Sequence, residues 1–157
     1  MTSVLFVCLG NICRSPTAHG VFQHYVDQAG LRDHIRVDSA GTGDWHIGKT
    51  PDARSQQAAK RRGYDLSGLR ARQVTAQDLN QFDYVLAMDR SNLQVLNSWY
   101  RGEAGQAEPQ LFLQAFGSGD ELEVPDPYYG GEQGFDHVLD LIEHASAELL
   151  RDIQARL

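Results

Sequence analysis

The sequence predicts an α/β fold: a single domain over residues 1–157, built on an open, parallel, four-stranded sheet with helices on both faces, in the Rossmann-like manner. Short apolar segments alternate with helical patterns along the chain, which is typical of parallel sheets connected by helices. A length of 157 residues suits one domain of ordinary size. Charged residues make up 22% of the chain and no internal repeat is found, so the composition is that of a globular protein.

The first strand–loop–helix unit has the clearest pattern. Residues 3–7 are apolar and partly β-branched, as expected for a strand buried on both faces. A helical pattern follows from residue 17 to about residue 29. Ser15 suits the N-cap of this helix and Pro16 its first turn, and Gly30 is a stop signal.

The later elements follow from apolar spacing and from nearby glycines and prolines. They are a strand at 35–40, a helix from 51 to about 62 with Gly63 behind it, a weaker helix at 75–81, a strand at 84–88, a helix at 91–98 and a fourth strand at 111–113. Apolar residues from Phe135 to Ile153 recur at helical spacing, which predicts a long amphipathic helix at the end. Residues 98–120 show no clear periodicity.

Charge and apolar runs exclude several classes of protein. The net charge is −7, from 21 acidic and 14 basic residues, which argues against nucleic acid or an anionic membrane as the main partner. An anionic substrate is still allowed. The apolar run Val4–Val7 is far shorter than the roughly 20 residues of a membrane helix, and it does not suit a signal peptide. We therefore expect a cytoplasmic protein.

Residues 8–15, between the first strand and its helix, have the composition of an anion-binding loop. Backbone N–H groups at a helix N-terminus can surround a phosphoryl group. Gly10 allows tight curvature, and Asn11 belongs to the few types that tolerate positive φ. Arg14 offers a planar fork for two phosphate oxygens. Cys8, at the end of the strand, is then a thiolate nucleophile placed behind phosphorus.

The two cysteines, Cys8 and Cys13, have other interpretations. Two cysteines are too few for a disulfide scaffold, and their spacing is not that of a zinc knuckle. Cys8 alone could be a buried apolar residue, but the loop around it argues for chemistry. Cys13 is either a packing residue or a partner for a reversible disulfide with Cys8. Metal binding together with His19 or His24 would compete with the anion-binding geometry, so we expect neither metal nor cofactor.

A candidate proton donor lies near the end of the chain. Asp126 stands between Pro125 and Pro127, which stiffen the segment and fix where the carboxyl points. A bound phosphate dianion nearby would favour the protonated carboxyl and make it a general acid. The alternative is an ordinary Asp-Pro turn. Tyr128 and Tyr129 favour the first interpretation, since they could wall a slot for a flat aryl ester.

Together these segments resemble the low-molecular-weight protein tyrosine phosphatase family. The first loop matches its Cys-x5-Arg-Ser signature, and residues 126–129 match its Asp-Pro-Tyr-Tyr element. Further similar segments, in order, are Asp38-Ser39-Ala40-Gly41-Thr42, Asp44-Trp45, Gly48, Pro51-Asp52, Ala71-Arg72-Gln73-Val74, Phe82-Asp83-Tyr84-Val85 and Met88-Asp89. The resemblance covers nearly the whole chain and implies the phosphotyrosine phosphatase I type of fold.

The resemblance also implies roles for individual residues. Cys8 would be the nucleophile, Arg14 the transition-state clamp and Asp126 the acid and later the base. The phosphate-binding loop would further comprise Leu9, Gly10, Asn11, Ile12, Cys13 and Ser15. In it Ser15 would hydrogen-bond the thiolate, and Asn11 would brace the loop together with Ser39. A histidine that braces the asparagine in some relatives is replaced here by Leu69 and Arg70.

The resemblance also implies a substrate slot and two forms of regulation. Ile12, Trp45 and Tyr128, with Tyr129 beside them, would line the aromatic slot. For Trp45 the alternative is a core aromatic, and for Ser39 a turn residue. Cys13 would trap an oxidised Cys8 as a disulfide, and the two tyrosines are phosphorylated in some relatives.

The sequence thus predicts hydrolysis of phosphotyrosine and small aryl phosphates through a cysteinyl-phosphate intermediate. Its partners would be phosphotyrosine proteins, a cognate tyrosine kinase, and inorganic phosphate as product and inhibitor. An arsenate reductase of this fold would need further cysteines, and a protein arginine phosphatase has threonine where Ile12 stands. A non-catalytic phosphotyrosine-binding module would not need Asp126. The sequence does not indicate the physiological substrate or the oligomeric state.

Overall fold

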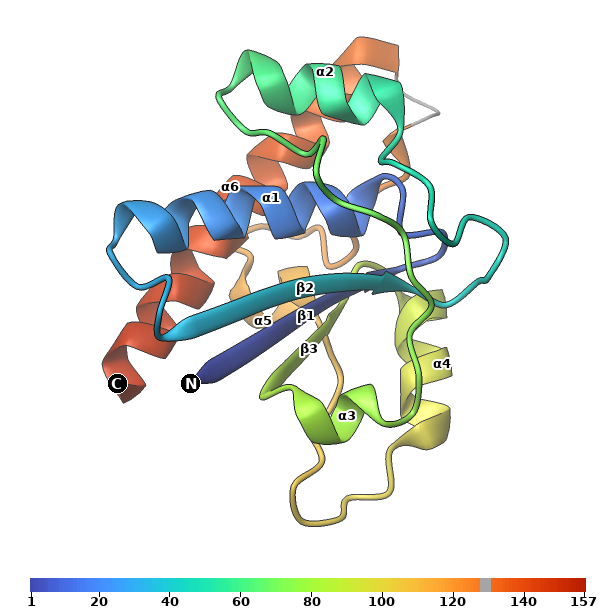
Figure 1. Ribbon diagram of the computed structural model, residues 1–157, viewed down its shortest axis with the longest axis vertical. Helices are drawn as coiled ribbons and strands as arrows, with labels where there is room; N and C mark the ends of the chain where they lie inside the picture. The colour runs from blue at the N-terminus through green and yellow to red at the C-terminus, as the bar shows by residue number, and fades with distance from the viewer. Residues whose placement is uncertain (128–130) are drawn as a thin grey trace.

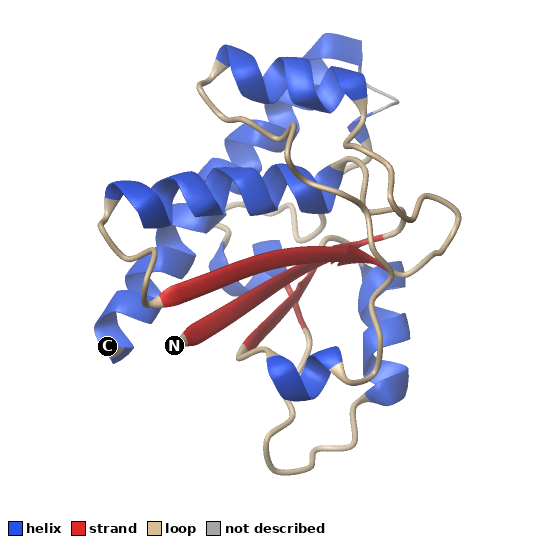
Figure 2. Ribbon diagram, viewed as in Figure 1, coloured by secondary structure: helices blue, strands red, loops and turns tan. Residues whose placement is uncertain are grey.

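The computed structural model describes residues 1–127 and 131–157, and in these residues a parallel four-stranded sheet forms the centre of the molecule (Figures 1 and 2). The strands lie in the order β2-β1-β3-β4, all parallel. Their bounds are Thr2–Cys8 for β1, Ile35–Gly41 for β2, Tyr84–Ala87 for β3 and Gln110–Leu111 for β4. The predicted fold class is therefore confirmed.

Helices cover both faces of the sheet (Figure 1). The bounds are Arg14–Gln28 for α1, Ala53–Arg61 for α2, Asp78–Gln81 for α3, Arg90–Trp99 for α4, Phe112–Phe116 for α5 and Gly131–Arg156 for α6. Helices α1, α5 and α6 pack on one face, and α2 lies across α1 and α6. Helices α3 and α4 cover the other face.

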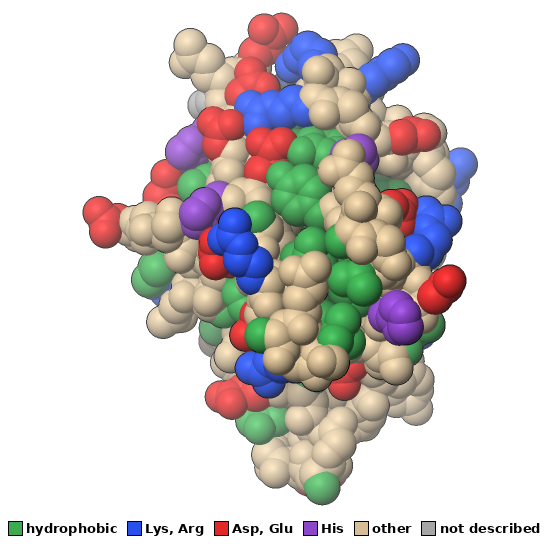
Figure 3. Space-filling model, turned by 90° about the vertical axis from the view of Figure 1, so that its left-hand side faces the viewer, with side chains coloured by type: hydrophobic (Ala, Val, Ile, Leu, Met, Phe, Trp, Pro, Cys, Tyr) green, Lys and Arg blue, Asp and Glu red, His purple; other side chains and the backbone are tan. Residues whose placement is uncertain are grey.

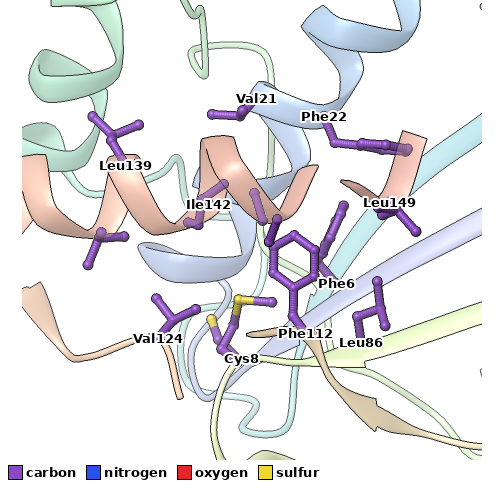
Figure 4. Close-up of a cluster of buried hydrophobic side chains, with 14 of the residues drawn as sticks. Phe6, Cys8, Val21, Phe22, Leu86, Phe112, Val124, Leu139, Ile142 and Leu149 are labelled. Atoms are coloured by element: carbon purple, nitrogen blue, oxygen red, sulfur yellow. The ribbon is translucent and has the colours of Figure 1, made fainter. Parts of the chain in front are cut away.

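The alternation of side chains along β1 builds both halves of the core. Val4 and Phe6 point into the larger cluster beneath α1 and α6, and Leu5 and Val7 into the smaller one beneath α3 and α4. The Phe6 ring makes an edge contact with Phe112, with centroids 5.1 Å apart. Figure 4 shows these rings, with Cys8 close to Val124 at the edge of the cluster. The strand prediction for residues 3–7 is confirmed.

Helix α1 begins earlier than the sequence predicts. Its first residue is Arg14 and its N-cap is Cys13, which makes no side-chain capping bond. The expected N-cap role of Ser15 is therefore wrong, because Ser15 lies inside the helix with its hydroxyl turned to the preceding loop. Pro16 is still in the first turn, where no backbone donor is required. Gly30, at φ +71°, ends the helix as predicted.

Two segments differ from the predictions. The expected helix at 75–81 is helical only in α3, because Asp78 accepts a bond from the backbone of Thr75 and closes a turn there. The expected strand at 111–113 is β4 followed directly by helix α5. Short apolar runs do not distinguish strand from helix, and here Phe112 and Leu113 reach the core from a helix.

The carboxyl ends of the long strands and the N-termini of α1 and α4 lie at one edge of the molecule, at the right of Figure 1. Figure 3 views the opposite end, where acidic and basic side chains are interspersed with apolar ones. Along the described part of the chain, no helix has the length and apolar character that crossing a bilayer requires.

Candidate active site

A cavity of about 140 Å³ lies at the carboxyl end of β1. Six of the residues that line it fall between the end of β1 and the start of α1, both ends included, and the others come from two distant segments: Cys8, Leu9, Gly10, Ile12, Cys13, Arg14, Trp45, His46 and Asp126. The cavity thus brings together the predicted cysteine, arginine and aspartate. A hollow of about 700 Å³ beside α2 is larger, but it is lined by surface residues such as Lys60 and Asp65.

The sulfur of Cys8 lies at the floor of this cavity. Cys8 is only 3% exposed. The backbone N–H of Asn11 donates to Cys8 Sγ at 3.3 Å, and Ser15 Oγ lies 3.0 Å from the same sulfur. Both groups are placed to donate a hydrogen bond to this sulfur.

Asn11 shapes the loop through its backbone and its side chain. It is a non-glycine residue with positive φ, at +55°, and is almost fully buried. Its Nδ2 donates to Ser15 Oγ at 2.8 Å, and its Oδ1 accepts from the backbone N–H of Arg72 at 3.0 Å. Since Ser15 Oγ accepts from Asn11, its own proton can be donated to Cys8. Asn11 Oδ1 is thus braced by a backbone amide.

The end of β2 lies directly against the loop. The N–H groups of Thr42 and Gly43 donate to the carbonyls of Cys8 and Leu9, both at 2.9 Å. A Cβ at Gly41 would lie 2.7 Å from the carbonyl oxygen of Leu9 and 3.0 Å from the nitrogen of Asn11. Only glycine therefore lets β2 and the loop come this close.

Arg14 is held in place and stays charged. Its Nη1 donates to Asp89 Oδ2 at 2.8 Å and to the carbonyl of Val124 at 2.9 Å. Asp89 is itself fixed as the N-cap of α4, in a capping box with Asn92. Burial lowers the pKa of Arg14, but the negative charges of Cys8, Asp89 and Asp126 outweigh it, so the net shift is upward.

Cys13 differs from Cys8 in its surroundings. Its Sγ lies 3.0 Å from Ser55 Oγ on α2. Burial raises the pKa of Cys13 to about 12, although the bond to Ser55 acts in the opposite direction. Both cysteines are free thiols in the structure. At neutral pH Cys13 is therefore a protonated thiol.

The apolar part of the cavity is open to solvent. Trp45 is 60% exposed and Leu9 50%, so Trp45 is not a core aromatic. Ile12 is half-buried, and Asp126 is an exposed residue at the cavity. The predicted slot residues Tyr128 and Tyr129 lie outside the described residues.

Ser39 is a strand residue and not a turn residue. Its hydroxyl lies 3.0 Å from His19 Nδ1 on α1, one turn beyond the loop. Burial lowers the pKa of His19, although the charge of Asp38 acts in the opposite direction, so the pair is neutral at pH 7. Across the described ranges, no group of three or more His, Cys, Asp or Glu is placed to hold a metal ion.

Sequence reasoning missed His46, Asp89 and the role of Arg72. His46 lines the cavity, and its ring lies over Gly10. A Cβ added at Gly10 would be 2.9 Å from Cδ2 of His46. Its buried Nδ1 makes no hydrogen bond within the described residues. In the sequence, the position of His46 directly after Trp45 could have indicated that it lies at the site. Asp89 and Arg72 stand in segments that matched the family, but only the folded chain shows what they contact.

Comparison with known proteins agrees with this geometry. The sequence profile of the low molecular weight phosphotyrosine protein phosphatases matches residues 3–157. The chain belongs to this family. It is a low-molecular-weight protein-tyrosine phosphatase, and its substrates contain phosphotyrosine.

Relatives and solved structures match over nearly their full length. The low molecular weight protein-tyrosine-phosphatase YfkJ of Bacillus subtilis is 44% identical, over 98% of this chain and 97% of its own. A crystal structure of a protein tyrosine phosphatase from Entamoeba histolytica superimposes with a TM-score of 0.91 at 37% identity, covering 100% of both chains. A Drosophila arginine phosphatase superimposes with a TM-score of 0.86 at 35% identity, over 98% of each chain.

Proposed function

We propose that this phosphatase hydrolyses phosphotyrosine by two displacements at phosphorus, with Cys8 as nucleophile, Arg14 as clamp and Asp126 as acid and base. The observation that carries the proposal is that Cys8 Sγ, fixed by Asn11 and Ser15, shares one small cavity with the other two groups. A thiolate at the floor of an anion-binding loop faces the phosphorus of a bound phosphoryl group.

In the first displacement Cys8 Sγ forms a bond to phosphorus, and the bond from phosphorus to the phenolic oxygen breaks. Asp126, protonated at this stage, gives its proton to the leaving oxygen. In the second displacement a water attacks phosphorus and loses a proton to the Asp126 carboxylate. The sulfur–phosphorus bond breaks, inorganic phosphate forms, and Ser15 and the N–H of Asn11 stabilise the departing thiolate.

The position of Arg14 supports its role as clamp. Within the described residues, both of its hydrogen bonds leave from Nη1. Its Nε and Nη2 donors remain for two oxygens of the phosphoryl group, in the planar geometry that suits phosphate. With the backbone amides of the loop, it would hold the charge that develops in both transition states.

The apolar side of the cavity supports an aromatic substrate. Trp45 and Leu9 expose large apolar surfaces there, and Ile12 lines the same cavity. A phenyl ring can pack against such surfaces, whereas the side chain of phosphoserine is too short to reach them. An arginine phosphatase is the second candidate because one is similar in structure, but the isoleucine at position 12 favours the aryl ester.

The test compares phosphotyrosine, phosphoserine and phosphoarginine in peptides of the same sequence, with Cys8→Ser as control. We expect rapid hydrolysis of the phosphotyrosine peptide alone, and no turnover by Cys8→Ser, which still binds phosphate. Faster hydrolysis of the phosphoarginine peptide would establish the second candidate. Wild-type turnover by Cys8→Ser would overturn the assignment of the nucleophile.

Rapid alkylation by iodoacetate at pH 6 distinguishes an enzyme from a phosphotyrosine-binding module. An activated thiolate at Cys8 reacts rapidly at this pH, and inorganic phosphate protects it by occupying the loop. A plain binding module needs no such thiolate. Slow alkylation that phosphate does not affect would support the module.

The wider setting is also part of the proposal. We expect the enzyme to act in the cytoplasm, where free thiols such as Cys8 stay reduced, on the products of a cognate tyrosine kinase. Inorganic phosphate would inhibit as well as leave as product. Cys13 would capture an oxidised Cys8 in a reversible disulfide, and this capture would break its bond to Ser55.

A further inference from the structure

We propose that Arg72 is a positioning residue for the phosphate-binding loop, holding Asn11 and through it the sulfur of Cys8. The inference rests on the proposed function, because it concerns the same nucleophile. Arg72 lies on the segment between α2 and α3, and it is not among the described residues that line the cavity. Its effect on the reaction would pass through Asn11.

The guanidinium of Arg72 joins two elements of the fold. Its Nε donates to Asp38 Oδ2 on β2 at 3.0 Å, and its two terminal nitrogens donate to the two carboxylate oxygens of Asp78 on α3, both at 3.1 Å. The Asp78 side chain is only 5% exposed. A planar fork bound to two carboxylates fixes residue 72 far more firmly than a single surface ion pair would.

The backbone of the same residue touches the loop and its support. The N–H of Arg72 donates to Asn11 Oδ1 at 3.0 Å. Its carbonyl accepts from the N–H of Gly41 at 2.8 Å, and Gly41 lies against the loop. The side chain of Arg72 therefore fixes the position of its own backbone, which braces Asn11 and holds the end of β2.

The path from Asn11 to the sulfur is short. Asn11 Nδ2 donates to Ser15 Oγ, which lies 3.0 Å from Cys8 Sγ, and the N–H of Asn11 donates to the same sulfur. Asn11 holds a φ of +55°, which is uncommon for residues other than glycine although asparagine tolerates it, so its hydrogen bonds help to keep it there. A displaced Arg72 would release Asn11 and with it two donors to the sulfur.

The test is the variant Arg72→Met with p-nitrophenyl phosphate as substrate. We expect kcat to fall by about 10- to 100-fold, because small displacements of a reacting group cost that much. The rate of alkylation of Cys8 by iodoacetate at pH 6 should fall with it. The matched control is Arg62→Met, which also loses ion pairs, to Asp140 and Glu143, but whose side chain pairs with α6 and not with the loop in the described part of the chain. Its kcat should stay at the wild-type value.

A double-mutant cycle separates positioning from general stability. In an Asn11→Ala background, Arg72→Met should lower kcat by less than about twofold, because the group through which it acts is already gone. An equal loss in both backgrounds would overturn the proposal. So would a wild-type kcat in Arg72→Met accompanied by a loss of stability like that of Arg62→Met.

A milder variant keeps the test decisive if Arg72→Met does not fold. In Arg72→Lys one ammonium cannot reach both carboxylates in the manner of the fork, so kcat should lie between wild type and Arg72→Met. Wild-type kcat and alkylation in Arg72→Lys would overturn the role of the fork. The Cys8→Ser control keeps the two hypotheses apart: turnover by that variant would overturn the proposed function, whereas the alkylation rate of Cys8 in Arg72→Met would still report whether Arg72 positions the sulfur.

Discussion

The proposed mechanism gives Cys8 and Asp126, two ionisable side chains in the cavity, separate chemical tasks, and each can be tested alone. Asp126 lies at the cavity but belongs to the segment after Val124, and the sulfur of Cys8 is fixed by other residues. Changing Asp126→Asn should therefore leave the nucleophile intact while removing the proton donor. We expect hydrolysis of aryl phosphates to slow by about 10²–10⁴-fold.

Steady-state kinetics with p-nitrophenyl phosphate measures this loss, and the iodoacetate reaction of Cys8 serves as the control. The alkylation rate should be that of the wild type, because alkylation needs no acid. Unchanged turnover in Asp126→Asn would show that the proton comes from elsewhere.

Burial of Cys13 predicts a pH dependence of stability. Its pKa is raised to about 12 in the folded protein from an unfolded value of 9.0. Between these values the unfolded chain has lost the thiol proton that the folded chain keeps, so stability falls as the pH rises. The slope from this group is about 1.4 kcal/mol per pH unit, and below pH 9 its contribution is fully present.

Urea unfolding from pH 8 to pH 11 measures this slope, with Cys13→Ala as the comparison. The variant should lose less stability over the alkaline range than the wild type. Burial also raises the pKa of Tyr84 to about 12, but that tyrosine is present in both proteins and does not affect the difference. Equal slopes would show that Cys13 is not shielded from water.

At the scale of elements, the close approach of β2 to the loop depends on Gly41. In Gly41→Ala the new methyl group would meet the backbone of Leu9 and Asn11, neither of which can rotate away. The loop must shift, and we expect kcat/KM for p-nitrophenyl phosphate to fall by at least about tenfold. Gly68→Ala is the control, since nothing lies within 4 Å of its added Cβ. Wild-type kinetics in Gly41→Ala would mean that the loop tolerates displacement.

The elements that the sequence predicts well are those whose patterns are local. Residues 3–7 form a strand and the helical spacing from Phe135 to Ile153 lies on helix α6, both as predicted. Residues 110–116 form a strand of two residues and a helix of five. Each is too short for the apolar periodicity of a strand or of a helix to be recognised in the sequence. Helix α1 begins early because Ser15 bonds the loop instead of capping the helix.

The same distinction applies to the site. Cys8 and Arg14 lie on one loop, so their spacing already indicates an anion-binding geometry. The amide of Arg72 is 61 residues away from Asn11 in the chain, and no sequence pattern predicts that contact. His46 reaches the cavity, and Asp89 reaches Arg14, from the segments that follow β2 and β3, so these contacts also come from packing that the sequence does not show.

At the scale of the whole molecule, both halves of the core depend on a single strand. Alternate residues of β1 enter the two clusters, so neither cluster can come apart without exposing that strand. Large apolar side chains such as Phe6 on one face and Leu5 on the other are fully buried. This arrangement supports the proposal that residues 1–157 form one domain with one cooperative unit.

We therefore expect a single unfolding transition in urea, with the same midpoint for every probe. Far-UV circular dichroism follows all the helices, whereas tryptophan fluorescence includes Trp99, which packs against the smaller cluster. Trp45→Phe removes the exposed tryptophan at the cavity, so that fluorescence reports on Trp99 alone. Coincident curves would indicate that the clusters on the two faces of the sheet unfold together. If the fluorescence curve had the lower urea midpoint, the face covered by α3 and α4 would be a separate unfolding unit. Cys8, which belongs to the larger cluster, would then depend on the other face alone.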